Sequence, residues 1–325
     1  MNIHSIYEKH HYRFLWFNIA FVVIFASQYS PFYFNETKSI DFFNNPNNFL
    51  SLVCLFLILT VGISHGALDN LKGYKLLKYY KINSKIIFYL IYSAFAILVA
   101  CVWFFFPSFV LVIFLIFAAH HFGKEDCSFV TLRKSKINFL KFFLKGSFII
   151  FLPLLCKFDQ TLNIFKSLYI ENDTLINTLV LFDKNGIFIY LVVISFLSNF
   201  FLSKNPGKYM TFFMEAFVLF LLNLATAPLV AFTIYFCFLH SVRHSITLAR
   251  ELNKNDFSKG FKKFISKALP LTLITAIFFI ISLLVLKNYY ILNDAILKVI
   301  FIGLASLTFP HILLEYLLEK NEKRT

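Results

Sequence analysis

Residues 50–69 read LSLVCLFLILTVGISHGALD, a nearly uninterrupted apolar run that ends in His65 and, four residues later, Asp69. A helix that crosses a bilayer needs about 20 mostly apolar residues. An ionisable group at membrane depth is costly, about 2.5–3.5 kcal/mol for a full charge on insertion scales, so its presence there indicates a function. The stretch therefore predicts a membrane-spanning helix with a functional histidine at its end.

Runs of the same kind fill the rest of the chain. The sequence has 325 residues, of which 59% are hydrophobic, whereas soluble domains have roughly 45–50% apolar residues. No segment between the runs is long enough for a soluble domain, so we expect one integral-membrane domain over residues 1–325. The predicted fold is all-α, a polytopic transmembrane helix bundle of about ten spans, with eight as the lower bound. The candidate spans lie near residues 13–34, 48–66, 85–106, 108–122, 139–157, 177–202, 210–224, 228–248, 268–287 and 294–316.

The net charge of +14 comes mainly from basic residues in short loops. In a soluble protein this charge balance would make nucleic-acid binding a candidate function. No nucleic-acid motif is present, however, and a membrane orientation signal explains the excess of basic residues better. The richest basic loops follow the second, fourth and eighth predicted spans. The positive-inside rule therefore places both termini in the cytoplasm, with residues 1–12 and 317–325 as short cytoplasmic segments. The five cysteines show no C-x-x-C spacing and are expected to be apolar fillers.

Five histidines lie in or at the ends of the apolar runs, all on even-numbered spans that descend toward the cytoplasm. Their similar depth makes a single cluster possible. His240 and His244 are four residues apart and share one helix face, whereas His120 points about 100° away from its neighbour His121. Ligands from several helices can enclose a metal ion, and neutral imidazoles suit Fe, Zn, Cu and Ni. The five histidines are His65, His121, His240, His244 and His311.

Charged residues near the histidines could support such a centre. Two aspartates follow the first two histidines by four and five residues, and carboxylates often accept the second imidazole N–H in metal sites. Alternatively, these aspartates only mark the points where the helices leave the bilayer. The residues concerned are Asp69 and Asp126, together with Glu215 and Arg243, which are expected to pair with each other.

The ordered set of histidine motifs resembles one family of membrane enzymes. H-G-x-x-D begins at His65, H-F-G-x-x-D at His121 and H-S-x-R-H at His240, and P-H ends at His311. In this order they resemble the Brp/Blh family, which are integral-membrane β-carotene 15,15′-dioxygenases of bacteria and archaea that supply retinal to rhodopsins. The resemblance covers about residues 50–315. It implies cleavage of the central double bond of β-carotene by O2 to give two molecules of all-trans retinal.

The resemblance also implies a cofactor, partners and a location. It implies a non-haem Fe(II) held by four histidines, which map onto His65, His121, His240 and His244. His311 matches a further family histidine that would complete the metal shell or line the substrate tunnel, and the doubled His120 leaves two candidates at that position. The expected partners are β-carotene or a related carotenoid, O2, the lipid bilayer and a microbial rhodopsin that receives the product, and the expected location is the bacterial inner (cytoplasmic) membrane.

A C40 hydrocarbon dissolves in the bilayer, so an enzyme that acts on it should open to lipid rather than to water. Aromatic residues near the histidines could line an apolar tunnel that aligns the polyene, or they could be ordinary core. These aromatic residues are Phe117, Phe122, Tyr235, Phe236, Phe238 and Phe309.

Other functions stay open at this point. A transporter or channel could use the histidines for proton coupling, although no internal repeat is visible in the sequence. Membrane di-iron desaturases and hydroxylases are identified by a series of H-x-x-x-H and H-x-x-H-H motifs. This chain has the first motif once and lacks the second. A b-type cytochrome would use two histidines on facing helices as axial haem ligands.

Overall fold

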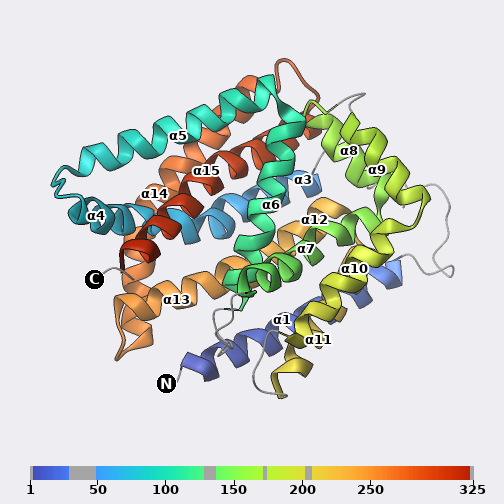
Figure 1. Ribbon diagram of the computed structural model, residues 1–325, viewed down its shortest axis with the longest axis horizontal. Coiled ribbons are helices and arrows are strands. Elements are labelled where there is room, and N and C mark those ends of the chain that lie inside the picture. Colours follow the sequence, from blue (N-terminus) through green and yellow to red (C-terminus); the bar gives the residue numbers. More distant parts are fainter. Residues whose placement is uncertain (1–2, 29–48, 128–136, 171–173, 202–206, 323–325) are drawn as a thin grey trace.

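The chain forms a bundle of helices (Figure 1). The structure, a computed structural model, describes residues 3–28, 49–127, 137–170, 174–201 and 207–322. Every regular element within these ranges is a helix, which confirms the all-α prediction. In the first half of the chain they are α1 (Ile3–Gln28), α3 (Phe49–Leu57), the π-helix η2 (Ile58–Gly62), the 3-10 helix η3 (Ile63–Leu68), α4 (Asp69–Tyr79), α5 (Lys85–Phe105), α6 (Pro107–Asp126) and α7 (Asn138–Cys156). In the second half they are α8 (Phe158–Ser167), α9 (Thr174–Lys184), α10 (Ile187–Leu197), the 3-10 helix η4 (Ser198–Phe201), α11 (Gly207–Ala225), α12 (Pro228–Ile234), the π-helix η5 (Tyr235–Ser241), α13 (Val242–Leu252), α14 (Phe257–Leu286) and α15 (Leu292–Glu322).

Seven helical segments in the described ranges are long and apolar enough to cross a membrane. Two of them are composite: Phe49–Tyr79 joins α3 to α4, and Pro228–Leu252 joins α12, η5 and α13. The others are α5, α6, α7, α14 and α15. The pair α9 and α10 would make an eighth span, bent by 82° next to Gly186, whose left-handed φ of 65° costs glycine little.

The expected count of about ten spans is therefore not reached in the described part of the chain. The run near 13–34 corresponds to α1, which is 26 residues long but not apolar enough over its described residues to count as a span, and residues 29–34 lie outside the described ranges. The run near 210–224 forms an apolar helix that is shorter than a span. The cytoplasmic placement of both termini remains a prediction.

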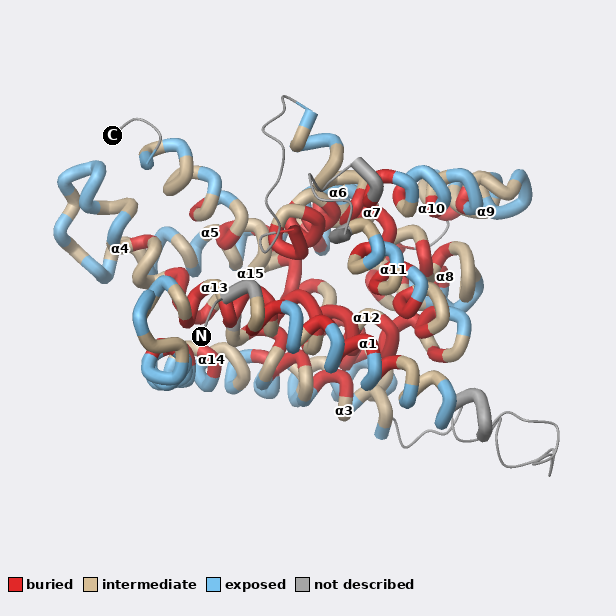
Figure 2. The backbone as a smooth tube through the Cα atoms, turned by 90° about the horizontal axis from the view of Figure 1, so that it is seen from below, coloured by how far each residue is buried: buried red, intermediate tan, exposed pale blue. Residues whose placement is uncertain are grey.

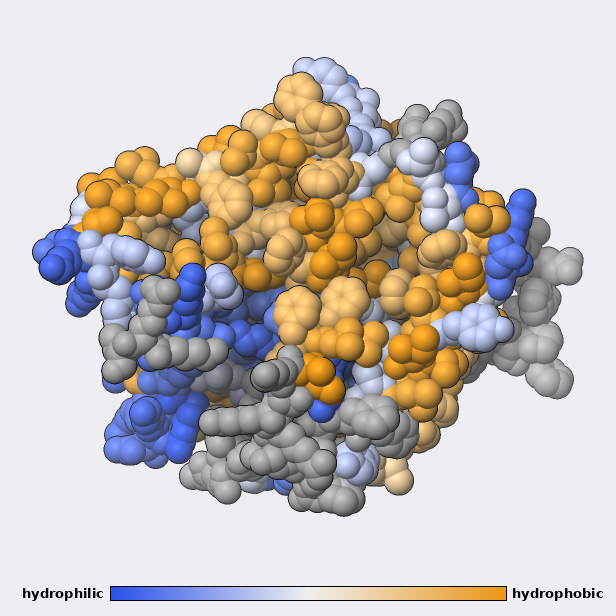
Figure 3. All heavy atoms as spheres, viewed as in Figure 1, coloured by the Kyte–Doolittle hydropathy of each residue, from blue (hydrophilic) through white to orange (hydrophobic). Residues whose placement is uncertain are grey.

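Burial differs strongly between the spans (Figure 2). In the most apolar window of the segment Pro228–Leu252, 83% of the residues are buried, whereas in that of α14 only 11% are buried, and α14 exposes aliphatic and aromatic side chains. Apolar side chains also cover most of the face seen in Figure 3, and hydrophilic ones gather at the lower left, where Figure 1 shows the ends of α4 and α13. An apolar exterior around a polar, histidine-bearing centre is the distribution that a lipid environment favours, because lipid cannot solvate charged groups.

The two π-helices lie against each other inside the bundle. The hydroxyl of Ser241 in η5 donates to the carbonyl of Gly62 in η2 at 3.0 Å. A Cβ at Gly62 would lie 2.7 Å from the ring of Phe236, so this approach requires glycine. π-Helical turns within α-helices are rare and often mark functional sites. Here η2 directly precedes η3, which carries His65, and η5 contains His240.

Helices α6 and α7 touch backbone to backbone through a reciprocal pair of glycines. A Cβ at Gly123 would overlap the carbonyl of Phe142, and a Cβ at Gly146 would overlap the carbonyl of Ala119. Small residues let membrane helices approach this closely. The contact fixes α6 at the level of His121, which lies two residues before Gly123.

Candidate functional site

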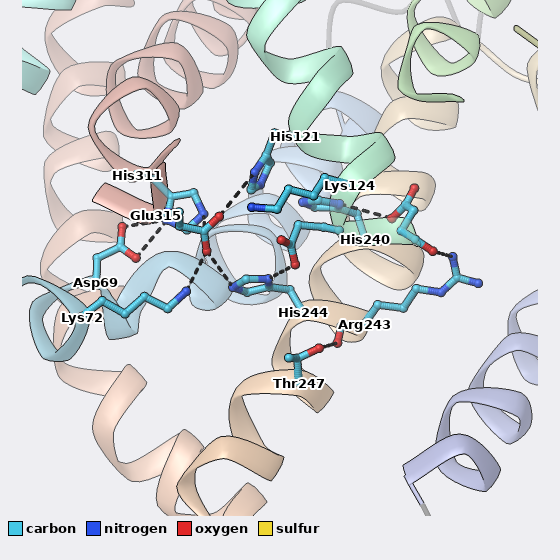
Figure 4. Close-up of polar contacts among 12 residues, drawn as sticks. Asp69, Lys72, His121, Lys124, His240, Arg243, His244, Thr247, His311 and Glu315 are labelled. Atoms are coloured by element: carbon cyan, nitrogen blue, oxygen red, sulfur yellow. Dashed lines mark hydrogen bonds and ion pairs between the residues drawn. The ribbon is translucent and has the colours of Figure 1, made fainter. Parts of the chain in front are cut away.

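Four of the five predicted histidines meet in the interior of the bundle (Figure 4). His121 comes from α6, His240 from η5, His244 from α13 and His311 from α15. The ring centroid of His121 lies 5.3 Å from that of His240 and 5.1 Å from that of His311, and the centroids of His244 and His311 are 5.9 Å apart. All four side chains are buried. His65 lies on η3 at the end of η2, and its side chain is outside the described part of the structure.

A carboxylate that sequence reasoning missed lies among these rings. Glu315 Oε2 is 3.8 Å from Nδ1 of His121, and Glu315 Oε1 is 3.9 Å from Nε2 of His244 and 3.8 Å from Nε2 of His311. The ammonium of Lys72 donates to Glu315 Oε1 at 2.7 Å. Glu315 therefore joins three of the histidines, with Lys72 compensating its charge.

Three further carboxylates hold the outer nitrogens of the histidines. Asp69 accepts from Nδ1 of His311 at 2.8 Å, and Glu125 accepts from Nδ1 of His244 at 2.7 Å. Asp126 lies 3.4 Å from Nδ1 of His240. A carboxylate at Nδ1 fixes that nitrogen as the protonated one and leaves the lone pair on Nε2. Three of the four imidazoles are thus set in the tautomer that can bind a metal through Nε2.

The carboxylate partners differ from those that sequence proximity indicates. Asp69, four residues after His65, contacts His311 of α15 and also accepts from the hydroxyl of Tyr92 at 2.8 Å. Asp126, five residues after His121, faces His240 and accepts from the hydroxyl of Tyr235 at 2.8 Å. The alternative that these aspartates only mark helix ends does not hold, because both are buried and hydrogen-bonded.

His120 points away from the cluster. Its ring stacks on that of Phe139 in α7, with centroids 4.4 Å apart and planes inclined by 24°. The neighbouring His121 instead contacts Glu315. The doubled histidine therefore contributes one imidazole to the centre and one to the contact between α6 and α7.

A second buried network of charges is linked to Asp126 through Arg243. Arg243 donates to Oε2 of Glu215 at 2.7 Å, the pairing that the sequence predicts, and Lys145 donates to Oε1 at 3.0 Å. Nδ1 of His11 from α1 lies 3.3 Å from Arg243. Arg243 also donates to the backbone carbonyl of Asp126 at 3.4 Å. Each charge in this network has a partner, as buried charges require.

An apolar cavity of about 100 Å³ approaches the histidines between α6, α7, α8 and α12. Of the aromatic residues predicted to line a tunnel, Phe122 and Tyr235 line it, and Phe122 contacts His240 with ring centroids 4.8 Å apart. The other four do not line this cavity: Phe117 is 46% exposed and packs on Phe309, Phe238 packs on Phe17, and Phe236 stacks on His240. Thr161 and Asn223 are polar lining residues in an otherwise apolar wall.

The donor set fits a transition-metal ion. Two atoms that each lie about 2.1 Å from one ion are at most about 4.2 Å apart, and the three contacts of Glu315 with histidine nitrogens fall within this limit. The ligand atoms of His121, His311 and Glu315 lie within 4.8 Å of one another, close to this limit. Imidazoles with a carboxylate are ligands typical of non-haem Fe(II).

The two missed acidic residues had a weak signal in the sequence. Glu125 follows His121 by four residues and Glu315 follows His311 by four residues, the same spacing that singled out Asp69. Residues four apart on a helix lie on one face. A search for His-x-x-x-acid rather than for aspartates alone would have found both.

Comparisons with known proteins give the chain a family. A family model described as Beta-carotene 15,15′-dioxygenase matches residues 56–319, a range that includes all five histidines. A curated relative from uncultured marine bacterium 66A03, named Beta-carotene 15,15′-dioxygenase, is 29% identical over 278 residues, which cover 83% of this chain and 94% of the relative. No solved structure matches the chain.

Proposed function

The chain belongs to the β-carotene 15,15′-dioxygenase family, and from this membership we propose that it cleaves the central double bond of β-carotene with O2 at a non-haem Fe(II) centre. Each carbon of the broken bond receives one oxygen atom, so the products are two molecules of all-trans retinal. The observation that carries the proposal is the convergence of four buried histidines and one carboxylate beside an apolar cavity.

The metal would be held by residues from four helical segments. His121, His244 and His311 surround Glu315, and His240 adds a fourth imidazole from the π-helix. His65, which the resemblance implies as a ligand, is a further candidate. When bound, Fe(II) supplies the chemistry that activates O2 toward the polyene.

The surrounding residues orient the ligands and exclude water. Asp69, Glu125 and Asp126 hold the Nδ1 protons of three imidazoles, so that their Nε2 atoms can serve the metal. The phenol of Tyr235 holds the second oxygen of Asp126 and lines the cavity at the same time. Tyr235 thus joins the apolar pocket to the carboxylate that orients His240.

The cavity would receive the reacting part of the substrate. A segment of the polyene would lie in it, against its apolar wall. Phe122 and Tyr235 would place that segment beside His240, and fixing which double bond meets the metal is a source of both specificity and rate. The ends of the substrate would extend between helices toward the lipid.

The direct test combines metal analysis with product analysis. Protein purified from β-carotene-producing cells should contain non-haem iron and convert added β-carotene to retinal under O2, as measured by elemental analysis and chromatography. We expect His121→Ala to abolish iron binding and retinal formation. The matched control is His120→Ala, which removes the adjacent imidazole that stacks on Phe139 and should keep both properties.

The oxygen stoichiometry separates a dioxygenase from a monooxygenase. In ¹⁸O2, with the aldehydes reduced at once to prevent exchange with water, both product molecules should carry the label. Label in only half of the product would contradict the dioxygenase assignment. Retinal formation by protein that is free of iron would contradict the iron assignment.

The location follows from the same chemistry. Seven apolar helical segments in the described part of the chain and a lipid-soluble substrate support a place in a bilayer, and we propose the cytoplasmic membrane of a bacterium, where the carotenoid partitions. Retinal that leaves toward lipid would be available to a microbial rhodopsin in the same membrane. Co-expression with an opsin and measurement of its visible absorption tests this transfer.

A further inference from the structure

The N-terminal helix α1 precedes the residues matched by the family model, which begin at 56, yet it packs against the helix that carries His240 and His244. Three of its side chains reach that helix: Tyr7 contacts Thr247, His10 contacts Phe238 and His11 contacts Arg243. Tyr7 lies three residues before His10 and four before His11, so it shares a helix face with each of them, and all three side chains lie on the side of α1 that meets this helix.

His10 forms a hydrogen bond with the backbone of the π-helix η5. Its Nε2 lies 2.8 Å from the backbone carbonyl of Phe238, two residues before His240. A carbonyl only accepts, so Nε2 of His10 carries the proton. In an α-helix the N–H of Val242 would donate to Phe238, but here it donates to Leu239. His10 thus supplies a donor to a carbonyl at the point where the helix departs from α-helical bonding.

His11 is connected to His240 by a second set of hydrogen bonds. Arg243 donates to its Nδ1 and also to the backbone carbonyl of Asp126. Asp126 in turn faces Nδ1 of His240. Two adjacent residues of α1 are therefore connected to His240 by hydrogen bonds. His10 is connected through the backbone of η5, and His11 through Arg243 and Asp126.

We propose that α1 is a positioning element for the metal centre, in which the hydrogen bond from His10 to Phe238 holds the π-helix in the conformation that presents His240. This rests on the proposed function, because it assumes that the histidine cluster binds a metal. His10 acts through the backbone carbonyl of Phe238, so it is a positioning residue and not a catalytic one.

The test compares variants of the full chain with Co(II) as a coloured substitute for Fe(II). His10→Leu removes the donor, and His10→Gln restores an N–H at nearly the place of Nε2. Tyr7→Phe is the control, since it removes a contact between the same two helices that does not touch the π-helix. Losing one hydrogen bond should weaken Co(II) binding about 2- to 10-fold.

We expect His10→Leu to alter the visible Co(II) spectrum and the affinity, His10→Gln to restore both, and Tyr7→Phe to match the wild type. A purely structural role would lower thermal stability in all variants and leave the spectrum of the folded protein unchanged. Should His10→Leu fail to fold, His10→Asn, whose amide stops short of Phe238, takes its place.

Two failures can be told apart. If the wild type forms retinal with iron and binds Co(II), but His10→Leu has the wild-type spectrum and affinity, only the role of α1 is overturned. If the wild type binds no metal, the proposed function fails and the role of α1 fails with it.

Discussion

Replacing Gly123 with alanine tests whether the backbone contact between α6 and α7 sets the position of the centre. The added methyl would overlap the carbonyl of Phe142, a backbone atom that cannot rotate away as a side chain would. Gly123 lies between His121 and Glu125 on α6. Any shift of α6 that relieves the overlap therefore moves His121, a proposed metal ligand. It also moves Glu125, which accepts a hydrogen bond from the proposed ligand His244.

The size of the effect follows from the overlap. The two backbones must separate by roughly 1 Å or more, and forcing a methyl into a packed interior costs about 1–3 kcal/mol of folding stability. A misplacement of about 1 Å at an active site can lower the rate about 10²-fold. We therefore expect Gly123→Ala to fold with reduced stability and to form retinal about 100 times more slowly, even when it is supplied with excess iron.

The control is the other glycine that follows a motif histidine. Among the described residues beyond its two chain neighbours, a Cβ at Gly66 would meet only Asp69 Oδ2, at 3.9 Å, an ordinary contact. Initial rates of retinal formation at saturating iron, measured for both variants beside the wild type, give the comparison. A rate for Gly123→Ala within a factor of about two of the wild type, or an equal loss in Gly66→Ala, would refute the reasoning.

Three further substitutions probe the charges around the centre. Asp69→Asn replaces the carboxylate that fixes the tautomer of His311 with a neutral amide that can also donate, and metal titration should show an affinity about 10–100-fold lower. An unchanged affinity would show that the charge of Asp69 does not support metal binding. Glu315→Gln should weaken metal binding at least about tenfold, and retention of full iron content would exclude Glu315 as a ligand. Glu215→Gln leaves the buried Arg243 without its charged partner and should lower the free energy of unfolding by about 3–5 kcal/mol, measured by thermal denaturation in detergent; a midpoint equal to that of the wild type would contradict it.

The sequence predicts the helical class and most spans of this fold because apolar length is a local property. The runs near 85–106, 108–122, 139–157 and 294–316 all correspond to helices that meet the length and hydropathy criteria. The count of about ten spans is not confirmed in the described ranges, because hydropathy does not report whether an apolar segment bends. The run near 177–202 is two helices at 82°, and that angle depends on a left-handed Gly186.

The site divides in the same way between local and non-local information. Loop charges and histidine positions predict which helix ends share a depth, and the structure brings His121, His240, His244 and His311 together there. The sequence does not predict which carboxylate pairs with which histidine, since partners can lie far apart along the chain: Asp69 and His311 are 242 residues apart. Such partners are fixed by how the helices rotate about their axes, and hydropathy carries no information about that rotation.

The two π-helices make the length of the chain itself a determinant of the centre. A π-helix holds one residue more than an α-helix would over the same hydrogen-bonded path. His240 lies inside η5, and η2 ends three residues before His65. Deleting one residue from 235–241 would allow α-helical bonding over that path, and α13 would keep nearly its present rotation relative to α12. The residues that the deletion moves most are those inside the π-helix, His240 among them, although no ligand has been replaced. A single-residue deletion in this segment therefore separates the placement of His240 from that of His244.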